Sequence, residues 1–95
     1  MKMLIFTKDS CGPCGLVKRY FRAMGNPLTE EIQEIELEDF SDDPIPQENL
    51  DLAKQYGVTA TPVLVITEDD GEMIAKYVGG TNITQNIRQV FARYV

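Results

Sequence analysis

The 95-residue sequence predicts an α/β fold in which a small mixed sheet of four strands is covered by helices on both faces. Short apolar segments of strand length alternate with amphipathic segments of helix length, in the order β-α-β-α-β-β-α. A helical crossover joins the first two strands, which makes them parallel. The turn-forming residues 68–71 join the last two strands, which makes these antiparallel.

The first strand and the first helix follow each other closely. Residues 2–7 form an apolar run ended by polar residues, which is typical of a buried strand. From residue 14 to residue 24, apolar side chains recur at helical spacing and predict one buried face. This face comprises Leu16, Val17, Tyr20, Phe21 and Met24. Lys18, Arg19 and Arg22 are left for solvent, and Gly25 ends the helix.

The middle of the chain predicts an edge strand and a second helix. Residues 32–38 alternate two apolar side chains with three glutamates, so only one face of this strand is buried. Residues 39–46 are rich in acidic residues and proline and predict a connection. A helix is expected from about residue 47 to 56, with Gly57 as its C-terminal cap.

The last part of the chain predicts a hairpin followed by a helix. Residues 62–67 are apolar on both faces, as in a central strand, and residues 72–78 return beside them. Asn82 and Gln85 resemble a capping box at the start of the final helix. The apolar side chains of that helix are Ile83, Ile87, Val90, Phe91 and Tyr94.

Composition excludes several classes of function. The 15 acidic and 9 basic residues give a formal charge of −6, which disfavours non-specific binding of nucleic acid. No apolar run reaches the roughly 18–20 residues of a membrane span, and no signal peptide is recognisable. The absence of histidine removes imidazole from every catalytic role. We therefore expect one monomeric domain over residues 1–95 in the cytoplasm, with no membrane or nucleic-acid partner.

Both cysteines stand in one unit, Cys11-Gly12-Pro13-Cys14, between the first strand and the first helix. Proline is tolerated at a helix start, because its missing N–H has no partner there. Cys11 then lies beside unpaired N–H groups and the positive end of the helix dipole, which stabilise a thiolate. Cys14, one turn further, is within disulfide reach. The pair can therefore reduce a disulfide in two steps: Cys11 forms a mixed disulfide, and Cys14 resolves it.

Two other uses of the cysteine pair stay open at this point. A structural disulfide would close a very short loop, which stabilises a fold by about 2 kcal/mol in the loop-entropy estimate. A zinc or iron-sulfur site needs four ligands, and two thiolates without histidine supply only half of them. A metal would then require a dimer or an external thiol, so we expect no metal site within one chain.

The Cys11-Gly12-Pro13-Cys14 unit after a strand, with Thr61-Pro62 opening a later strand, resembles the active-site motif and cis-proline of the thioredoxin and glutaredoxin superfamily. The element order is similar to the thioredoxin-like fold over nearly the whole chain. The resemblance implies a redox-active disulfide, with Cys11 as nucleophile, Cys14 as resolving cysteine and no bound cofactor. It also implies that Pro62 is cis and that the Thr61 backbone pairs with substrate. Otherwise, Pro62 simply starts a strand.

Further features are similar to glutaredoxins, whose co-substrate is glutathione. Lys8 stands three residues before Cys11, where many glutaredoxins have a lysine that meets a glutathione carboxylate. The Thr61-Pro62 backbone offers hydrogen bonds to a peptide-like ligand. The segment Gly79-Gly80-Thr81-Asn82 resembles the Gly-Gly-x-Asp turn that receives the γ-glutamyl end of glutathione. A solvated Lys8 and a plain turn at Gly79-Gly80 are the alternative interpretations.

The sequence also departs from both branches of the superfamily. Asn82 replaces the aspartate usual in glutaredoxins, and Asp9 adds a negative charge near Cys11. Gly12-Pro13 is similar to thioredoxins, but Ile5 stands where they have the buried aspartate that assists proton transfer. Deprotonation of Cys14 would then need Lys8, Glu36 or water.

The resemblance implies a thiol-disulfide oxidoreductase, an electron-transport protein of cell redox homeostasis that reduces protein disulfides. A ribonucleotide reductase is one enzyme that such proteins serve. Electrons would return from a flavoprotein of the thioredoxin-reductase type or from glutathione. The expected substrate surface comprises Cys11, Gly12, Pro13, Thr61, Pro62 and Gly79. A glutathione-dependent glutaredoxin and a redox-independent interaction subunit that uses the same surface are the alternatives.

Overall fold

The computed structural model describes residues 1–39, 41 and 44–94, and it has the predicted order of strands and α-helices. The strands are β1 (Lys2–Thr7), β2 (Ile32–Glu36), β3 (Val63–Thr67) and β4 (Met73–Val78). The α-helices are α1 (Gly12–Met24), α2 (Gln47–Gln55) and α3 (Gly80–Tyr94). A 3₁₀ helix, Pro27–Glu31, which the sequence pattern does not predict, leads into β2. It begins where the Asn26 side chain accepts the Leu28 N–H at 3.0 Å.

The sheet has the strand order β2-β1-β3-β4. β1 is parallel to β2 and antiparallel to β3, and β3 is antiparallel to β4, which confirms the predicted mixed sheet. Strands β1 and β3, which carry apolar residues on both faces, occupy the two central positions. β2, with its glutamates, lies at an edge as predicted.

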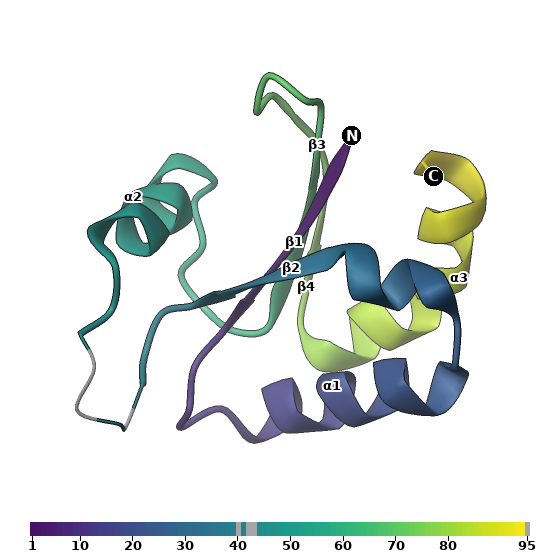
Figure 1. The fold of residues 1–95 in the computed structure, drawn as a ribbon, viewed down its shortest axis with the longest axis horizontal. Coiled ribbons are helices and arrows are strands. Elements are labelled where there is room, and N and C mark those ends of the chain that lie inside the picture. Colours follow the sequence, from purple (N-terminus) through teal and green to yellow (C-terminus); the bar gives the residue numbers. More distant parts are fainter. Residues whose placement is uncertain (40, 42–43, 95) are drawn as a thin grey trace.

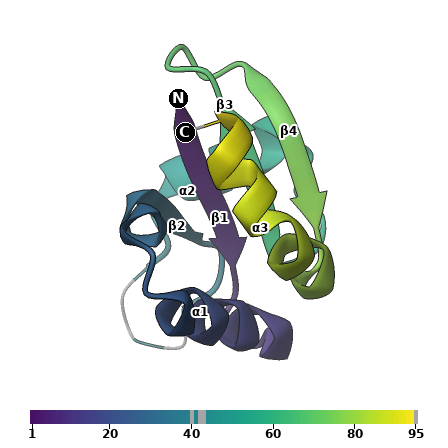
Figure 2. The ribbon, with the colours of Figure 1, turned by 90° about the vertical axis from the view of Figure 1, so that its right-hand side faces the viewer.

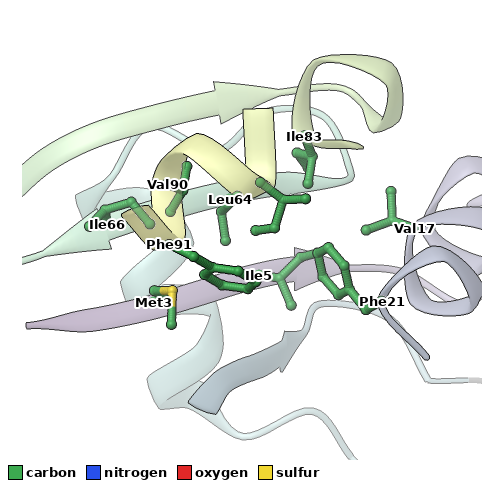
Figure 3. Close-up of a cluster of buried hydrophobic side chains, with 10 residues drawn as sticks. Met3, Ile5, Val17, Phe21, Leu64, Ile66, Ile83, Val90 and Phe91 are labelled. Atoms are coloured by element: carbon green, nitrogen blue, oxygen red, sulfur yellow. The ribbon is translucent and has the colours of Figure 1, made fainter. Parts of the chain in front are cut away.

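Helices cover both faces of the sheet: α1 and α3 lie on one side and α2 on the other (Figure 1). Successive side chains of β1 point to opposite faces of the sheet and so divide the core in two: Met3 and Ile5 face α1 and α3, whereas Leu4 and Phe6 face α2. Figure 3 shows the first of these clusters, in which side chains of β1 and β3 meet those of the two helices. Its buried members are Met3, Ile5, Val17, Phe21, Leu64, Ile66, Ile83, Ile87, Val90 and Phe91.

Helix α1 differs from its predicted pattern at two side chains. Val17 and Phe21 are buried as predicted, but Leu16 is 60% exposed, so it is wrong to place it in the core. Lys18 is half-buried and forms an ion pair with Glu34, so it is not simply left to solvent. The buried face of α1 is therefore narrower than the sequence predicts, because the sheet lies under only one side of the helix.

The helix ends follow local backbone geometry. Gly25 ends α1 in the left-handed conformation, with φ of 62°, and its N–H donates to the Arg22 carbonyl. The predicted capping box at Asn82 is wrong, because α3 begins two residues earlier, at Gly80. Asn82 therefore lies inside the first turn, and its side-chain oxygen accepts a hydrogen bond from the Asn86 amide at 2.9 Å.

The predicted connection 39–46 lies in part outside the described residues. Helix α2 ends one residue earlier than expected, at Gln55. Its C-cap is Tyr56, and the N–H of Gly57, the next residue, donates to the Lys54 carbonyl. No helix in the described part of the chain is both long and apolar enough to cross a membrane.

Candidate active site

Cys11 and Cys14 form a disulfide at the start of α1, directly after the loop that leaves β1. Their Cα atoms are 5.4 Å apart, which confirms that the spacing puts them within disulfide reach. Cys11 is the N-cap residue, with an extended backbone, and its N–H donates to the Lys8 carbonyl at 3.2 Å. The helix begins here because Pro13 fits the first turn of a helix, where no N–H partner is needed.

The helix start also sets the electrostatics of the two sulfur atoms. The Cys14 backbone N–H donates to Cys11 Sγ at 3.2 Å, so a sulfur atom takes the position of an N-cap acceptor. An N–H donor and the positive end of the helix dipole stabilise negative charge on that sulfur once the disulfide is reduced. Cys11 is half-buried, whereas Cys14 is only 2% exposed. An external disulfide therefore meets Cys11 first.

Strand register brings three distant segments to the end of the sheet that carries the disulfide. Val63 pairs with Phe6 and with Val78, so the residues just before β3 and just after β4 lie near the end of β1. The Thr61–Pro62 peptide bond is cis, as the family resemblance implies, and Pro62 is buried. The Gly79 N–H donates to the Pro62 carbonyl at 2.9 Å. Gly79 has a φ of 95°, which is why glycine suits this turn.

The first residue of α3 packs against the first turn of α1. A Cβ atom added to Gly80 would lie 3.4 Å from both Pro13 Cβ and Val17 Cγ2. Such a Cβ atom would be in ordinary van der Waals contact with α1, so the start of α3 lies directly against the first turn of α1 (Figure 2). The structure thus brings Gly79 and Gly80 beside the disulfide loop, together with Pro62.

The other predicted site residues lie in the same region with differing contacts. Gly12 and Pro13 are exposed, and Thr61 is half-buried. Thr81 is exposed at the start of α3, and its carbonyl accepts the Thr84 hydroxyl. Asn82 is exposed too, but its side chain is bonded along the helix to Asn86. The roles that the resemblance assigns to these residues stay predictions.

Glu38 holds the loop that precedes Cys11, a role that the sequence pattern does not reveal. Its side chain accepts the Ser10 N–H at 2.9 Å, and its carbonyl accepts the Asp9 N–H at 3.2 Å. The hydrogen bonds from Ser10 lower the pKa of the Glu38 carboxyl, and the positive charge of Lys8 lowers it further. Lys8 therefore lies near the Glu38 carboxylate, in the segment that follows β2, as well as near Cys11.

A polar cluster lies between α1 and the ends of β1 and β2. The Thr7 hydroxyl donates to Glu34 at 2.7 Å, and Glu34 also forms the ion pair with Lys18. Burial raises the pKa of the Glu36 carboxyl, the nearby carboxylates of Glu34, Asp39 and Asp9 raise it further, and Lys18 lowers it. Lys18 stands four residues after Cys14, a spacing that could have indicated a polar group on the cysteine's side of α1.

The raised pKa of Glu36 predicts a dependence of stability on pH. The folded protein holds the Glu36 proton more tightly than the unfolded chain, whose carboxyl has a pKa near 4.5. The stability that this proton contributes is complete below that pH and is lost as the pH rises through the folded-state pKa. We expect Glu36→Gln to stabilise the protein at neutral pH but hardly at all under acid conditions, as measured by urea unfolding at both pH values. Glu31→Gln, at an exposed carboxyl, is the matched control; an equal gain at both pH values for Glu36→Gln would contradict the assignment.

A shallow apolar groove runs from the disulfide loop between α1 and α3. It has a volume of about 290 Å³ and is lined by Pro13, Leu16, Val17, Gly80, Thr81 and Thr84. Leu16 and Thr81 are exposed at its rim. The sequence pattern does not reveal this groove, because helical spacing alone assigns Leu16 to the core.

Comparisons with known proteins agree with this architecture. A family model described as a thioredoxin-like domain matches residues 1–93, whereas no curated protein matches the sequence. The solved thioredoxin of Fasciola hepatica is 22% identical, with a TM-score of 0.67, over 98% of this chain and 79% of its own. The germline-specific thioredoxin Deadhead of Drosophila melanogaster is 17% identical, with a TM-score of 0.68, over the same shares of 98% and 79%. Mitochondrial thioredoxin 3 of Saccharomyces cerevisiae is 25% identical, with a TM-score of 0.59, over 92% of this chain and 76% of its own.

These matches confirm the predicted thioredoxin-like fold, and the family model extends over nearly the whole chain. The bonded cysteine pair stands at the strand-to-helix junction, with a cis-proline at the same end of the sheet. The chain therefore belongs to the thioredoxin-like family and is, in general terms, a thiol-disulfide oxidoreductase.

Proposed function

We propose that the protein reduces disulfide bonds of other proteins, with Cys11 as the nucleophile and Cys14 as the resolving cysteine. The observation that carries this proposal is the position of Cys11 Sγ, which caps α1 and accepts the Cys14 N–H at 3.2 Å. The same contact that orients the sulfur stabilises it as a thiolate. The burial of Cys14, at 2% exposure, keeps it from external disulfides and leaves it for the second step.

The reaction begins with both cysteines reduced. The Cys11 thiolate attacks one sulfur of a substrate disulfide, and the other substrate sulfur leaves as a thiolate that takes a proton from water. The Cys14 thiol then loses its proton and its sulfur attacks Cys11 Sγ, which releases the second substrate thiolate. The substrate gains two electrons, and the protein ends with the Cys11–Cys14 disulfide present in this structure.

Two features support binding and proton transfer around this exchange. Exposed Gly12 and Pro13, with half-buried Thr61 beside cis-Pro62, leave backbone accessible to an extended substrate segment. The candidate acceptors of the Cys14 proton are Lys8, Glu36 and water. Among them, Glu36 is a carboxylate whose pKa is raised by burial, which makes it a stronger base than an ordinary glutamate.

The proposed electron source is a flavoprotein of the thioredoxin-reductase type, and the proposed acceptors include enzymes such as a ribonucleotide reductase. The thioredoxin-like family match and the Gly12-Pro13 pair support this assignment. Glutathione as co-substrate is the second candidate. The observation that favours it is the place of Gly79 and Gly80 beside the disulfide loop, with Gly80 packed against Pro13.

The two electron sources can be separated by offering the oxidised protein NADPH with thioredoxin reductase, or NADPH with glutathione reductase and glutathione. We expect faster reduction in the first system, measured as NADPH oxidation with insulin as the acceptor. Asn82→Asp, which restores the charge usual in glutaredoxins, is the informative variant. If glutathione reduces the unmodified protein faster than thioredoxin reductase does, and Asn82→Asp makes the reduction by glutathione faster still, the flavoprotein assignment is overturned in favour of a glutaredoxin.

A further inference from the structure

Charge is distributed unevenly over the helices of this acidic protein. Helices α1 and α3 contain none of the 15 acidic residues of the chain, but five of its 9 basic residues. These five are Lys18, Arg19, Arg22, Arg88 and Arg93. Helix α2, on the opposite face of the sheet, carries both signs (Figure 1). The side of the molecule built by α1 and α3 therefore carries a basic surface on these two helices, although the net charge is −6 and the carboxylates of Glu34 and Glu36 lie beside α1 on the same side.

The basic side is also the side of the disulfide. Both helices start at the redox centre, since Cys11 caps α1 and Gly80 of α3 packs against Pro13. The groove of about 290 Å³ begins there and continues between the helices, with Leu16 60% exposed at its rim. Leu16 and the exposed Pro13 together give the groove an apolar surface beside the disulfide, against which an apolar side chain of a partner can pack.

On each helix, an exposed arginine lies one turn beyond a residue that lines the groove. Residues three and four apart are neighbours on a helix, so Arg19 lies one turn beyond Leu16 and Arg88 one turn beyond Thr84. Lys18 is already paired with Glu34, whereas Arg19 and Arg88 are both exposed. A chain segment that leaves the disulfide along the groove therefore meets an apolar surface first and two guanidinium groups after it.

We propose that this groove binds substrate proteins whose reducible cysteine is followed by an apolar residue and then by acidic residues. The inference rests on the proposed function and specifies its substrate class. The apolar side chain lies against Leu16 and Pro13, and the carboxylates pair with Arg19 and Arg88. The exchange chemistry itself is unchanged, because docking only raises the fraction of encounters that place the substrate disulfide at Cys11.

The test uses three disulfide-closed peptides of equal length, which differ only in a short tail of glutamate, glutamine or lysine residues after a leucine. Reduced protein is mixed with each peptide, the reaction is quenched with acid, and the reduced peptide is quantified by chromatography. At low salt, we expect the glutamate peptide to react about fivefold faster than the glutamine peptide and the lysine peptide to react slowest. The differences between the three rates should nearly vanish at about 0.5 M salt, where charges are screened over a few ångströms.

Charge reversal supplies the matched variants. In the double variant Arg19→Glu, Arg88→Glu, the lysine peptide should become the fastest. Because this is a ratio measured within one protein, it does not depend on how much of the variant is folded. Lys54→Glu makes the same kind of change on α2, on the other face of the sheet, and should keep the original order.

The outcomes separate the inference from the function on which it rests. Equal rates for the three peptides, or a Lys54→Glu variant that alters the order as much as the arginine variant, would overturn the docking groove while leaving disulfide exchange in place. Failure to reduce any peptide would overturn the proposed function and the inference with it. A further experiment compares two competitors of the glutamate peptide: an oligothymidylate and a disulfide-free peptide with the same glutamate tail. If the oligothymidylate competes as well as the peptide, the surface binds polyanions in general, and an acidic protein segment is overturned as its occupant.

Discussion

Replacing Cys11 by serine is expected to lower the rate of insulin reduction by at least about a thousandfold, to the uncatalysed background. A serine hydroxyl stays protonated at neutral pH and cannot form the mixed disulfide, whereas the Cys11 sulfur is positioned by the Cys14 N–H at 3.2 Å. The measurement is dithiothreitol-driven insulin reduction with and without the protein. Since removing the disulfide can also loosen the fold, urea unfolding of the variant against the reduced unmodified protein is the control for stability.

Cys14→Ser is the matched variant, because it removes the same disulfide but keeps the nucleophile. We expect this variant to form a stable mixed disulfide with oxidised glutathione at Cys11, visible as a mass increase that dithiothreitol reverses. Cys11→Ser should show no such adduct, because Cys14 is only 2% exposed. The reverse pattern, with an adduct on Cys14 alone, would show that the assigned order of attack is wrong.

The cysteine variants also decide between redox chemistry and a binding role. A redox-independent interaction subunit would keep its cellular activity when Cys11 and Cys14 are both serine. The exchange mechanism requires that this double variant be inactive, while its fold, checked by circular dichroism, persists. Survival of activity in the double variant would therefore assign the protein to the binding class.

Leu64→Ala is expected to cost about 3 kcal/mol of the free energy of unfolding, within the range of about 2–5 kcal/mol for buried leucines. Leu64 is 0% exposed in the central strand β3, and its side chain lies in the core between the sheet and α3 (Figure 3). Truncation removes apolar contacts and leaves a cavity that the strands on either side hold open. Urea unfolding should show a lower midpoint with an unchanged slope.

The same chemical change at an exposed site is the control for this stability prediction. Leu50 on α2 is 42% exposed, so Leu50→Ala should change the free energy of unfolding by no more than about 0.5 kcal/mol. A loss below about 1 kcal/mol for Leu64→Ala would mean that the core around β3 collapses into the space or that the strand is not packed as described.

The sheet can be predicted from the sequence because its strands differ in hydrophobic pattern. Residues of β3 are apolar on both faces and β2 alternates with glutamates, which distinguishes a central strand from an edge strand by pattern alone. The 3₁₀ helix Pro27–Glu31 cannot be predicted in this way, since it has no buried residue and depends on the Asn26 cap. The pattern misplaces the start of α3 for a related reason: Gly79, not the polar Asn82, sets the turn that precedes it.

The cysteine pair can be predicted because its chemistry and its position are both local. Four residues at a strand-to-helix junction are enough to indicate a helix-capping thiolate, and the structure has Cys11 as the N-cap. The surroundings of the pair depend on contacts between distant segments. The ion pair of Lys18 with Glu34, the loop contacts of Glu38 and the groove beside Leu16 all need the strand register, which a single sequence does not specify.

The β3–β4 turn offers a site for attachment that leaves the redox centre facing solution. Thr67 pairs with Lys2, whereas Val63 pairs with Phe6, so residues 68–71 lie at the end of the sheet remote from the disulfide (Figure 1). Asp69 and Asp70 are exposed. Asp69 forms an ion pair with the N-terminus, but an ion pair at the surface contributes little to the stability of the fold. A label, a fused domain or a surface linker inserted between these two residues would hold the protein by the end opposite to its disulfide, which suits it to immobilisation as a thiol-disulfide oxidoreductase.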